Sequence, residues 1–516
     1  MGQYFLKKFV LTATGGMLCF IPESKEKVIT PRPNILLIHV DQLRFDCLGV
    51  TGNRDIKTPN IDAIAHDGVV YRNTFTTYPV STPSRYSLLS GLYVNEHQGW
   101  TNHCTLNPEI ETFPELLRQS GYKTKAVGKC HFTPTYLDVG FTELELAEQD
   151  GPGRLDDDYH RDLMKNHIID RNDLEDQVSS YRVKAGKEYF ESFGAIPTNL
   201  PDTFYSTRWI ADRALETIRN WNKSGNMLMV GFIKPHHPFD PPVSWKDMYD
   251  PSKLSLLPGW NANMDSIDLM ISKGYFPNEK LTEKSLRKVM AYYYALISQI
   301  DFEVGEMIKL LKQKGLYENT LIIFTSDHGE HMGYHHQILK GGEMFESIMR
   351  IPLIIKYPAN KKSGTTNREL VSNIDIAPTI LLQTGIKPPR RMSGIDLFQD
   401  KIGREIIFSH NNMGKSTIAR TQKGKLIFTP QGRSLYFDLV KDPLEFTDLF
   451  NNPDYQKEIA GLRESIVKWQ GNDSPDVKVY LDENAPVIKQ PNVPLLTDDH
   501  REIISRYFEQ MMKSSK

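Results

Sequence analysis

The feature that most restricts the fold is the apolar run NILLIHV, which begins at Asn34 and ends just before Asp41. A run without polar alternation is typical of a strand that is buried on both faces of a parallel sheet. Further strand candidates lie at 123–128, 226–235 and 319–327, with helical patterns between them. Strands that alternate with helices predict an α/β fold in which helices sandwich a large, mainly parallel sheet.

The pattern changes after about residue 400. Short apolar segments follow one another closely there, namely REIIFSH, STIART, KLIFTP and SLYFDL, and a helical pattern covers 453–470. Closely spaced short strands favour antiparallel pairing. We therefore expect an N-terminal domain at 30–400 and a C-terminal subdomain with an extended tail at 401–516, built from a smaller antiparallel sheet plus one helix.

The composition excludes some classes of function. Of the 516 residues, 39% are hydrophobic and 24% are charged, which is typical of a globular protein, and the formal net charge is −2. Because there is no basic field, we expect no nucleic-acid partner, and an anionic substrate would have to be bound by a few placed cations. The cysteines Cys19, Cys47, Cys104 and Cys130 show no CxxC spacing and predict no zinc ribbon.

The first 23 residues have the pattern of an export signal. Lys7 and Lys8 precede the apolar stretch FVLTATGGMLCF, which is too short to span a membrane comfortably. We therefore expect a signal peptide at 1–23 and a periplasmic, cell-surface or secreted protein, with a lipoprotein form through Cys19 as an alternative. We expect no transmembrane segment elsewhere.

Two carboxylates follow two of the predicted strands. Asp41 and Asp327 each stand where a strand ends, and Gln42 and His328 are their neighbours. Sites in open parallel sheets form beyond the carboxyl ends of the strands. Oxygen ligands with one imidazole suit Ca²⁺ or Mg²⁺. Either Asp alone would equally suit a turn or a helix cap.

Lysines and histidines follow the other predicted strands. Lys129 and His131 occur in GKCH, His236 and His237 in KPHHPF, and Lys340 follows the HMGYHHQIL segment. A lysine binds tetrahedral oxyanions as a compact charge, and a histidine can donate a proton near neutral pH. Each residue alone would also suit a solvated surface, but their repeated placement at strand ends indicates an anion-binding site.

The segment PVSTPSRYSLLSG predicts a helix that stops at Gly91. Pro83 favours a first helical turn, and a helix N-terminus attracts anions through its free N–H groups. Arg85 adds a cation one turn in. The pattern is consistent with Ser81 as a simple N-cap or as a nucleophile at an anion-binding helix start.

Together these motifs resemble the type I, formylglycine-dependent sulfatases of the alkaline phosphatase superfamily. The family signature of Cys or Ser, any residue, Pro, any residue and Arg reads here as Ser81-Thr82-Pro83-Ser84-Arg85. The resemblance runs from about 33 to about 470 and includes, in order, TPNID (58–62), GYKTKAVGKCH (121–131), KPHHPF (234–239), TSDHGEHMGYH (325–335), RIPLII (350–355) and SLYFDLVKDPLEFTDL (434–449).

The resemblance implies an alkaline phosphatase-like fold, with 30–400 as the catalytic sulfatase domain. It also implies that Ser81 is oxidised to formylglycine (3-oxoalanine) by an anaerobic sulfatase-maturating enzyme. The hydrated aldehyde would attack sulfur beside one Ca²⁺. The metal-ligand positions of the family fall on Asp41, Gln42, Ser81, Asp327 and His328, and many relatives have Asp where Gln42 stands and Asn where His328 stands.

The remaining roles follow from the same resemblance. Arg85 and Lys129 match positions that hold the modified residue and the sulfate. His131 matches the residue that assists sulfate release, His236 matches the general acid for the leaving oxygen, and Lys340 matches a second sulfate-binding lysine.

The function that the resemblance implies is an exported sulfatase that hydrolyses sulfate esters of carbohydrates, such as glycosaminoglycans or other sulfated glycans. Alternatives on the same fold are a choline or aryl sulfatase and a phosphonate monoester or phosphodiester hydrolase, and a more remote one is an inactive glycan-binding protein. Residues expected to set specificity are His237, the region around His103, and the insert 141–203 with Arg154, Asp156, Asp157, Asp158 and His160.

Overall fold

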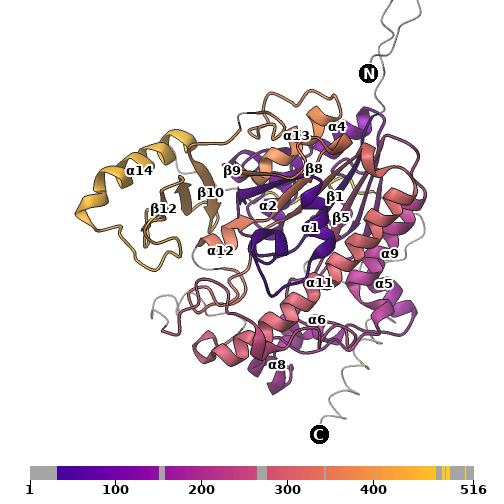
Figure 1. Ribbon diagram of the computed structural model, residues 1–516, viewed down its shortest axis with the longest axis horizontal. Helices are drawn as coiled ribbons and strands as arrows, with labels where there is room; N and C mark the ends of the chain where they lie inside the picture. Colours follow the sequence, from indigo (N-terminus) through magenta and orange to yellow (C-terminus); the bar gives the residue numbers. More distant parts are fainter. Residues whose placement is uncertain are drawn as a thin grey trace, which may run out of the picture. The chain divides into compact units, whose positions relative to one another are not determined.

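The computed structural model describes residues 32–149, 157–263, 276–341, 344–400, 402–471, 479–482, 484–488, 502 and 506 (Figure 1). The expected signal peptide with Cys19 lies outside the described residues, as do Arg154 and Asp156. The remaining predicted site residues are all described.

A large sheet is built around β1 (Asn34–Val40). β1 pairs in parallel with β5 (Asn226–Phe232) on one side and with β6 (Thr320–Ser326) on the other. Beyond β5, the sheet continues in parallel through β3 (Lys123–Gly128) to β4 (Glu143–Leu146). The predicted parallel strands are therefore confirmed, and their carboxyl ends lie at one edge.

The other half of the sheet is mixed. β8 (Leu353–Lys356) is antiparallel to both β6 and β2 (Val69–Phe75). β7 (Arg350–Ile351) is antiparallel to β2, and β9 (Thr365–Ser372) is parallel to it. Within the described residues the sheet has nine strands, so the expected large, mainly parallel sheet is confirmed.

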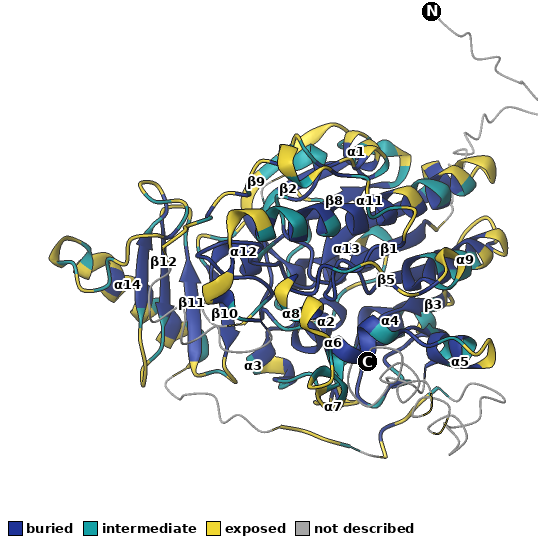
Figure 2. Ribbon diagram, turned by 90° about the horizontal axis from the view of Figure 1, so that it is seen from below, coloured by how far each residue is buried: buried dark blue, intermediate teal, exposed yellow. Residues whose placement is uncertain are grey.

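Helices cover both faces of this sheet, and Figure 2 shows the buried strands between them. Leu36 and Ile38 of β1 point into one apolar core and Ile35 and Leu37 into the other, because successive side chains of a strand alternate. The first core includes α1 (Pro59–His66), α9 (Ser206–Arg219) and α11 (Glu283–Gln313). The second includes α2 (Ser81–Ser90), α4 (Phe113–Gln119) and α13 (Ile376–Gln383).

Short helices occupy the insert after β4 and two turns elsewhere. They are α3 (Val94–His97), α5 (Asp158–Lys165), α6 (Arg171–Gln177), α7 (Ser179–Arg182), α8 (Lys187–Glu191) and α12 (Glu346–Met349).

A second sheet follows residue 402. Its antiparallel strands are β10 (Ile407–Asn411), β11 (Ser416–Arg420), β12 (Gly424–Phe428) and β13 (Leu435–Asp438). α14 (Gln456–Gln470) packs on this sheet (Figure 1), which confirms the predicted smaller sheet plus helix. The domain boundary near residue 400 stays a prediction.

The chain after α14 returns to the first domain. The backbone N–H of Thr105 donates to the Tyr480 carbonyl at 2.9 Å, and the N–H of Asp138 donates to the Pro486 carbonyl at 2.8 Å. The described part of the expected tail therefore lies along the loops that flank β3.

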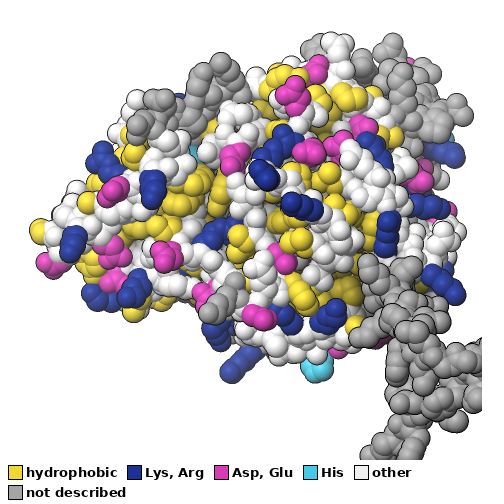
Figure 3. Space-filling model, turned by 90° about the horizontal axis from the view of Figure 1, so that it is seen from above, with side chains coloured by type: hydrophobic (Ala, Val, Ile, Leu, Met, Phe, Trp, Pro, Cys, Tyr) yellow, Lys and Arg dark blue, Asp and Glu magenta, His cyan; other side chains and the backbone are white. Residues whose placement is uncertain are grey.

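The surface carries no dominant charge. On the face in Figure 3, Lys and Arg side chains are scattered among Asp and Glu side chains, in agreement with the net charge of −2. Within the residues described, none of the helices has both the length and the apolar character needed to cross a bilayer. Cys47, Cys104 and Cys130 are buried free thiols.

A buried ionic cluster joins α12 to the second sheet. The Glu346 carboxylate lies 3.3 Å from the Arg420 guanidinium of β11 and 3.5 Å from the Lys425 ammonium of β12. Lys425 also pairs with Glu445 at 2.7 Å. Burial alone would raise the pKa of Glu346, but Arg420 and Lys425 hold it well below its ordinary value.

We expect Glu346→Gln to destabilise the chain by about 3 kcal/mol at pH 7, because it removes the buried carboxylate that compensates the Arg420 guanidinium. A depressed carboxyl pKa stabilises the fold above the ordinary value of 4.5 and loses this effect as the pH falls below it. The difference in the free energy of unfolding from the wild type should therefore shrink in acid, as measured by urea titration from pH 7 to pH 3. Glu306→Gln, which changes an exposed partner of Lys309, is the control and should have little effect. A pH-independent difference for Glu346→Gln would contradict the assignment.

Candidate active site

The ends of β1 and β6 bring Asp41 and Asp327 together. Val40 pairs with Ser326 in the parallel register, so the residues that follow lie side by side. His328 Nε2 is 3.7 Å from Asp41 Oδ1 and 3.8 Å from Asp327 Oδ1. Each of the three residues is fully buried and offers a ligand atom within 4.8 Å of the others.

These donors fit a divalent cation. His328 Nδ1 lies 3.0 Å from the Gly329 carbonyl and must donate to it, so the lone pair of Nε2 faces the carboxylates. Asp41 Oδ1 and Gln42 Oε1 are buried acceptors with no hydrogen-bond donor among the described residues. Buried acceptors without a donor are costly, and an oxygen-rich set with one imidazole suits Ca²⁺.

The protonation states agree with metal binding. Burial alone would raise the pKa of Asp41, but Lys129 and Arg85 hold it well below its ordinary value. The pKa of Asp327 is also lowered, since His328 and Arg85 outweigh burial and the neighbouring Asp41. Burial lowers the pKa of His328 to about 4. Near neutral pH these three groups are therefore in the forms that bind a cation.

Arg85 and Lys129 balance the two carboxylates. The Arg85 guanidinium donates to Asp327 Oδ2 at 3.0 and 3.1 Å and to Asp41 Oδ2 at 3.2 Å. The Lys129 ammonium lies 2.7 Å from the same oxygen of Asp41. Asp41 Oδ2 is therefore engaged by cations, whereas its Oδ1 faces His328.

Ser81 is the first residue of α2. The N-cap is Val80, so the interpretation of Ser81 as an N-cap is wrong by one residue, and the helix ends at Gly91 as predicted. The Thr82 N–H at the start of the helix donates to Asn102 Oδ1 at 3.1 Å. Ser81 Oγ lies instead 3.3 Å from His328 Nε2 and 3.5 Å from Lys340 Nζ.

Lys340 connects Ser81 to His236. Its ammonium is 2.9 Å from His328 Nε2 and 3.1 Å from His236 Nε2. His236 Nδ1 donates to the His237 carbonyl at 2.9 Å, so Nε2 accepts from Lys340. Burial, followed by the charge of Lys340, holds the pKa of His236 well below its ordinary value. His236 is therefore neutral near neutral pH.

His131 is tied to the same site through its backbone. Its N–H donates to Glu148 Oε1 at 2.9 Å, and its carbonyl accepts a hydrogen bond from Thr82 Oγ1 at 2.7 Å. Its φ of 58° lies in the left-handed region, which these two bonds stabilise. Burial raises the pKa of Glu148 to about 8. Sequence reasoning missed Glu148, which follows β4 and has no motif of its own.

The insert contributes side chains that the sequence did not single out. Gln149 accepts from Lys129 Nζ at 3.3 Å and donates to Asp173 Oδ1 at 2.9 Å and to the His237 carbonyl at 2.7 Å. Asp176 Oδ1 lies 2.5 Å from His237 Nδ1. α6 thus contacts Lys129 through Gln149 and contacts His237 directly through Asp176. The only sequence signal for these contacts was the acidic composition of the insert.

The insert residues named from sequence have structural contacts instead. Asp157 caps α5 by accepting from the His160 N–H at 2.7 Å, and it also accepts from the Glu148 N–H at 2.7 Å. Asp158 accepts from the Leu146 N–H at 2.8 Å. His103 is exposed. The expected specificity roles of these residues have no support in their contacts.

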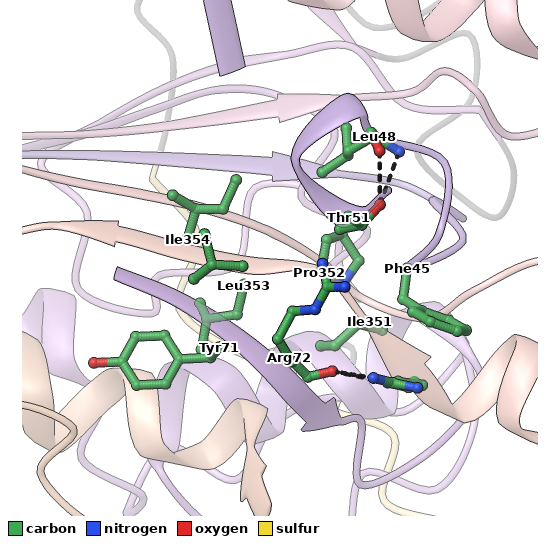
Figure 4. Close-up of a pocket in the computed structure, with 11 residues that line it drawn as sticks. Phe45, Leu48, Thr51, Tyr71, Arg72, Ile351, Pro352, Leu353 and Ile354 are labelled. Atoms are coloured by element: carbon green, nitrogen blue, oxygen red, sulfur yellow. Dashed lines mark hydrogen bonds between the residues drawn. The ribbon is translucent and has the colours of Figure 1, made fainter. Parts of the chain in front are cut away.

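A separate pocket lies under β2, β7 and β8, and none of the predicted site residues lines it (Figure 4). Arg350 donates to the Arg72 carbonyl at 2.8 Å and stacks on Phe45, with 4.1 Å between the guanidinium carbon and the ring centre. The remaining walls are mostly apolar, so this pocket lacks the chemistry found at the strand ends.

Comparisons with known proteins agree with the geometry. The chain matches the sulfatase family over residues 33–386 and the family described as N-sulphoglucosamine sulphohydrolase, C-terminal, over 329–472. An arylsulfatase of Clostridium perfringens is 31% identical over 85% of this chain and 94% of that protein. An N-acetylglucosamine-6-O-sulfatase of Bacteroides thetaiotaomicron is 25% identical over 89% of this chain and 90% of that protein.

A solved structure shows the same fold. The phosphonate monoester hydrolase of Agrobacterium radiobacter covers 89% of this chain and 100% of its own, with a TM-score of 0.72 and 24% identity. The architecture is thus that of the alkaline phosphatase-like hydrolases. The chain belongs to the sulfatase family. It is a sulfuric ester hydrolase.

Proposed function

We propose that this sulfatase hydrolyses sulfate esters of carbohydrates through a formylglycine formed at Ser81. The observation that carries the proposal is the position of Ser81 Oγ, at 3.3 Å from His328 Nε2 and 3.5 Å from Lys340 Nζ. A reactive oxygen there would lie between a candidate metal ligand and a cation suited to a sulfuryl group.

The chain's own residues supply most of the site. Asp41, Gln42, Asp327 and His328 would hold one Ca²⁺, which when bound supplies positive charge to the sulfuryl oxygens and to the nucleophile. Formylglycine, once formed, supplies the attacking oxygen, and Arg85 and Lys129 keep its surroundings positive. The binding of an anion near Lys340 would favour the protonation of His236 and so prepare it to protonate a leaving oxygen.

Several observations support the substrate and the setting. The relative from Bacteroides thetaiotaomicron is named for a sulfated sugar, and the N-terminal pattern at 1–23 is that of an exported protein. We infer a periplasmic, cell-surface or secreted enzyme that acts on a sulfated saccharide. A serine at position 81 would be oxidised by an anaerobic sulfatase-maturating enzyme.

We expect Ser81→Ala to abolish sulfate release and to leave the unfolding temperature nearly unchanged, because the hydroxyl makes only two contacts to the residues described, both of them long. In the wild type co-expressed with a serine-type maturase, peptide mass spectrometry should show the loss of two hydrogens at Ser81. Ser90→Ala, in the same helix, is the control and should stay active, since Ser90 Oγ donates to the Tyr86 carbonyl at 2.6 Å and accepts from the Leu92 N–H at 3.3 Å, and neither partner belongs to the site. Full activity with an unmodified Ser81 would refute the formylglycine.

We expect His236→Ala to reduce kcat/KM about 100-fold or more on alkyl sulfates of sugars, because these poor leaving groups need a proton. The loss on 4-nitrophenyl sulfate should be much smaller. His66→Ala, whose side chain is 88% exposed, serves as the control. Equal losses on both substrates would argue against an acid role.

The second candidate function is phosphonate monoester or phosphodiester hydrolysis. It is favoured by the Asp41-Gln42 and GKCHF motifs, which resemble those of phosphonate monoester hydrolases, and by the fold shared with the phosphonate monoester hydrolase of Agrobacterium radiobacter. We expect the matured enzyme to prefer an aryl sulfate over a matched aryl phosphonate monoester by at least tenfold in kcat/KM, or about 1.4 kcal/mol of transition-state stabilisation. The opposite preference would favour the second function.

A further inference from the structure

Gln42 is held in an unusual backbone conformation at the end of β1. Its φ is 60°, which is rare for a residue with a side chain. The Gln42 N–H donates to Asp327 Oδ1 at 3.0 Å, and the Gln42 carbonyl accepts a hydrogen bond from the Tyr293 hydroxyl at 2.7 Å. Both bonds are buried, so the direction in which the side chain leaves the backbone is fixed.

The Gln42 amide ends against Glu330. Gln42 Nε2 donates to Glu330 Oε2, and Glu330 Oε1 accepts hydrogen bonds from the backbone N–H groups of Met332, at 3.0 Å, and Leu339. Glu330 is fully buried. Two backbone N–H donors thus converge on one oxygen of this carboxyl group, which is the environment of an acceptor.

An acceptor at this position decides which end of the amide faces the cation site. A primary amide can present either its oxygen or its nitrogen to a neighbour, and only the nitrogen can donate to a carboxylate. With Nε2 bound to Glu330, Gln42 Oε1 is the buried acceptor that has no donor among the described residues. The amide oxygen, rather than the NH₂ group, is then the buried end without a donor, in a residue that follows Asp41 and donates its backbone N–H to Asp327.

We propose that Glu330 is a positioning residue that orients the Gln42 amide so that its oxygen can bind the divalent cation. The inference rests on the proposed Ca²⁺ site but not on the sugar, the formylglycine or the reaction.

The alternative is that Glu330 only anchors the loop from 330 to 339 through Met332 and Leu339. Glu330→Gln separates the two roles, because its remaining oxygen can still accept both backbone N–H groups. Its new NH₂ group would face the NH₂ group of Gln42, and Gln42 would have to turn its nitrogen toward the cation. Adding Gln42→Glu to the Glu330→Gln variant restores the hydrogen bond in the opposite direction. The amide at position 330 then donates, and the carboxylate at position 42 accepts.

The test measures Ca²⁺ dissociation constants by isothermal titration calorimetry on the chain with unmodified Ser81. We expect Glu330→Gln to weaken Ca²⁺ binding about 10- to 100-fold, as for other groups that orient metal ligands. Adding Gln42→Glu should return the affinity to near that of the wild type. In the wild-type background, Gln42→Glu would bring two carboxylates together and should raise the Ca²⁺ affinity much less. The effects of the two substitutions on Ca²⁺ affinity should therefore be strongly non-additive.

Two controls complete the design. Glu303→Gln changes another buried carboxylate, 3.7 Å from Arg208, and should leave the Ca²⁺ affinity unchanged. Unfolding temperatures without Ca²⁺ should show that each variant is folded.

Unchanged affinity in Glu330→Gln, or an equal gain from Gln42→Glu in both backgrounds, would overturn this inference alone. A wild type that bound no Ca²⁺ would overturn it together with the proposed metal. A failure to release sulfate from sugars in a chain that binds Ca²⁺ as expected would instead reject the proposed function.

Discussion

The rest of the site depends on the buried guanidinium of Arg85. Two carboxylates at neighbouring strand ends repel each other, and burial adds a large cost unless cations compensate them. Arg85 bonds both, at 3.0 and 3.2 Å, and a further arm donates to the Lys129 carbonyl at 2.8 Å. Arg85 lies one turn after Ser81 in α2. The helix that presents the hydroxyl therefore also supplies the cation that offsets the cost of burying Asp41 and Asp327 side by side. The position of Ser81 relative to the candidate ligands is thereby fixed.

The local charge of the site differs from that of the whole chain. The net charge is −2 and the face in Figure 3 is mixed, yet Arg85, Lys129 and Lys340 gather around Asp41, Asp327 and His328 at the strand ends. Attraction for a sulfate ester therefore arises over a few ångströms, inside a buried site, where salt screens it less than at the surface.

Much of the fold and the site was predictable because both follow from local patterns. β1, β5 and β6 are largely apolar runs, β3 alternates before it becomes apolar, and the residues that follow these strands make up most of the site. The mixed half of the sheet was not predicted, since β7 and β8 are short and β9 has an exposed, polar face. Gln149 and Asp176 were not predicted because their partners are distant in sequence. No sequence pattern indicates which side chains of the insert point toward the site. The N-cap was misplaced by one residue, which is within the ordinary uncertainty of helix ends.

The burial of Ser81 has a consequence for how active molecules arise. Its exposed fraction is 0%, and the α2 residues around it are buried as well. The proposed oxidation of Ser81 would need access of an enzyme to its Cβ, and the folded chain buries that atom. The proposed modification would therefore have to precede the packing of α2 against the ends of β1 and β6. The active fraction of a preparation would then depend on whether the oxidation of Ser81 is faster than the packing of α2. Treating the folded protein afterwards would not change that fraction.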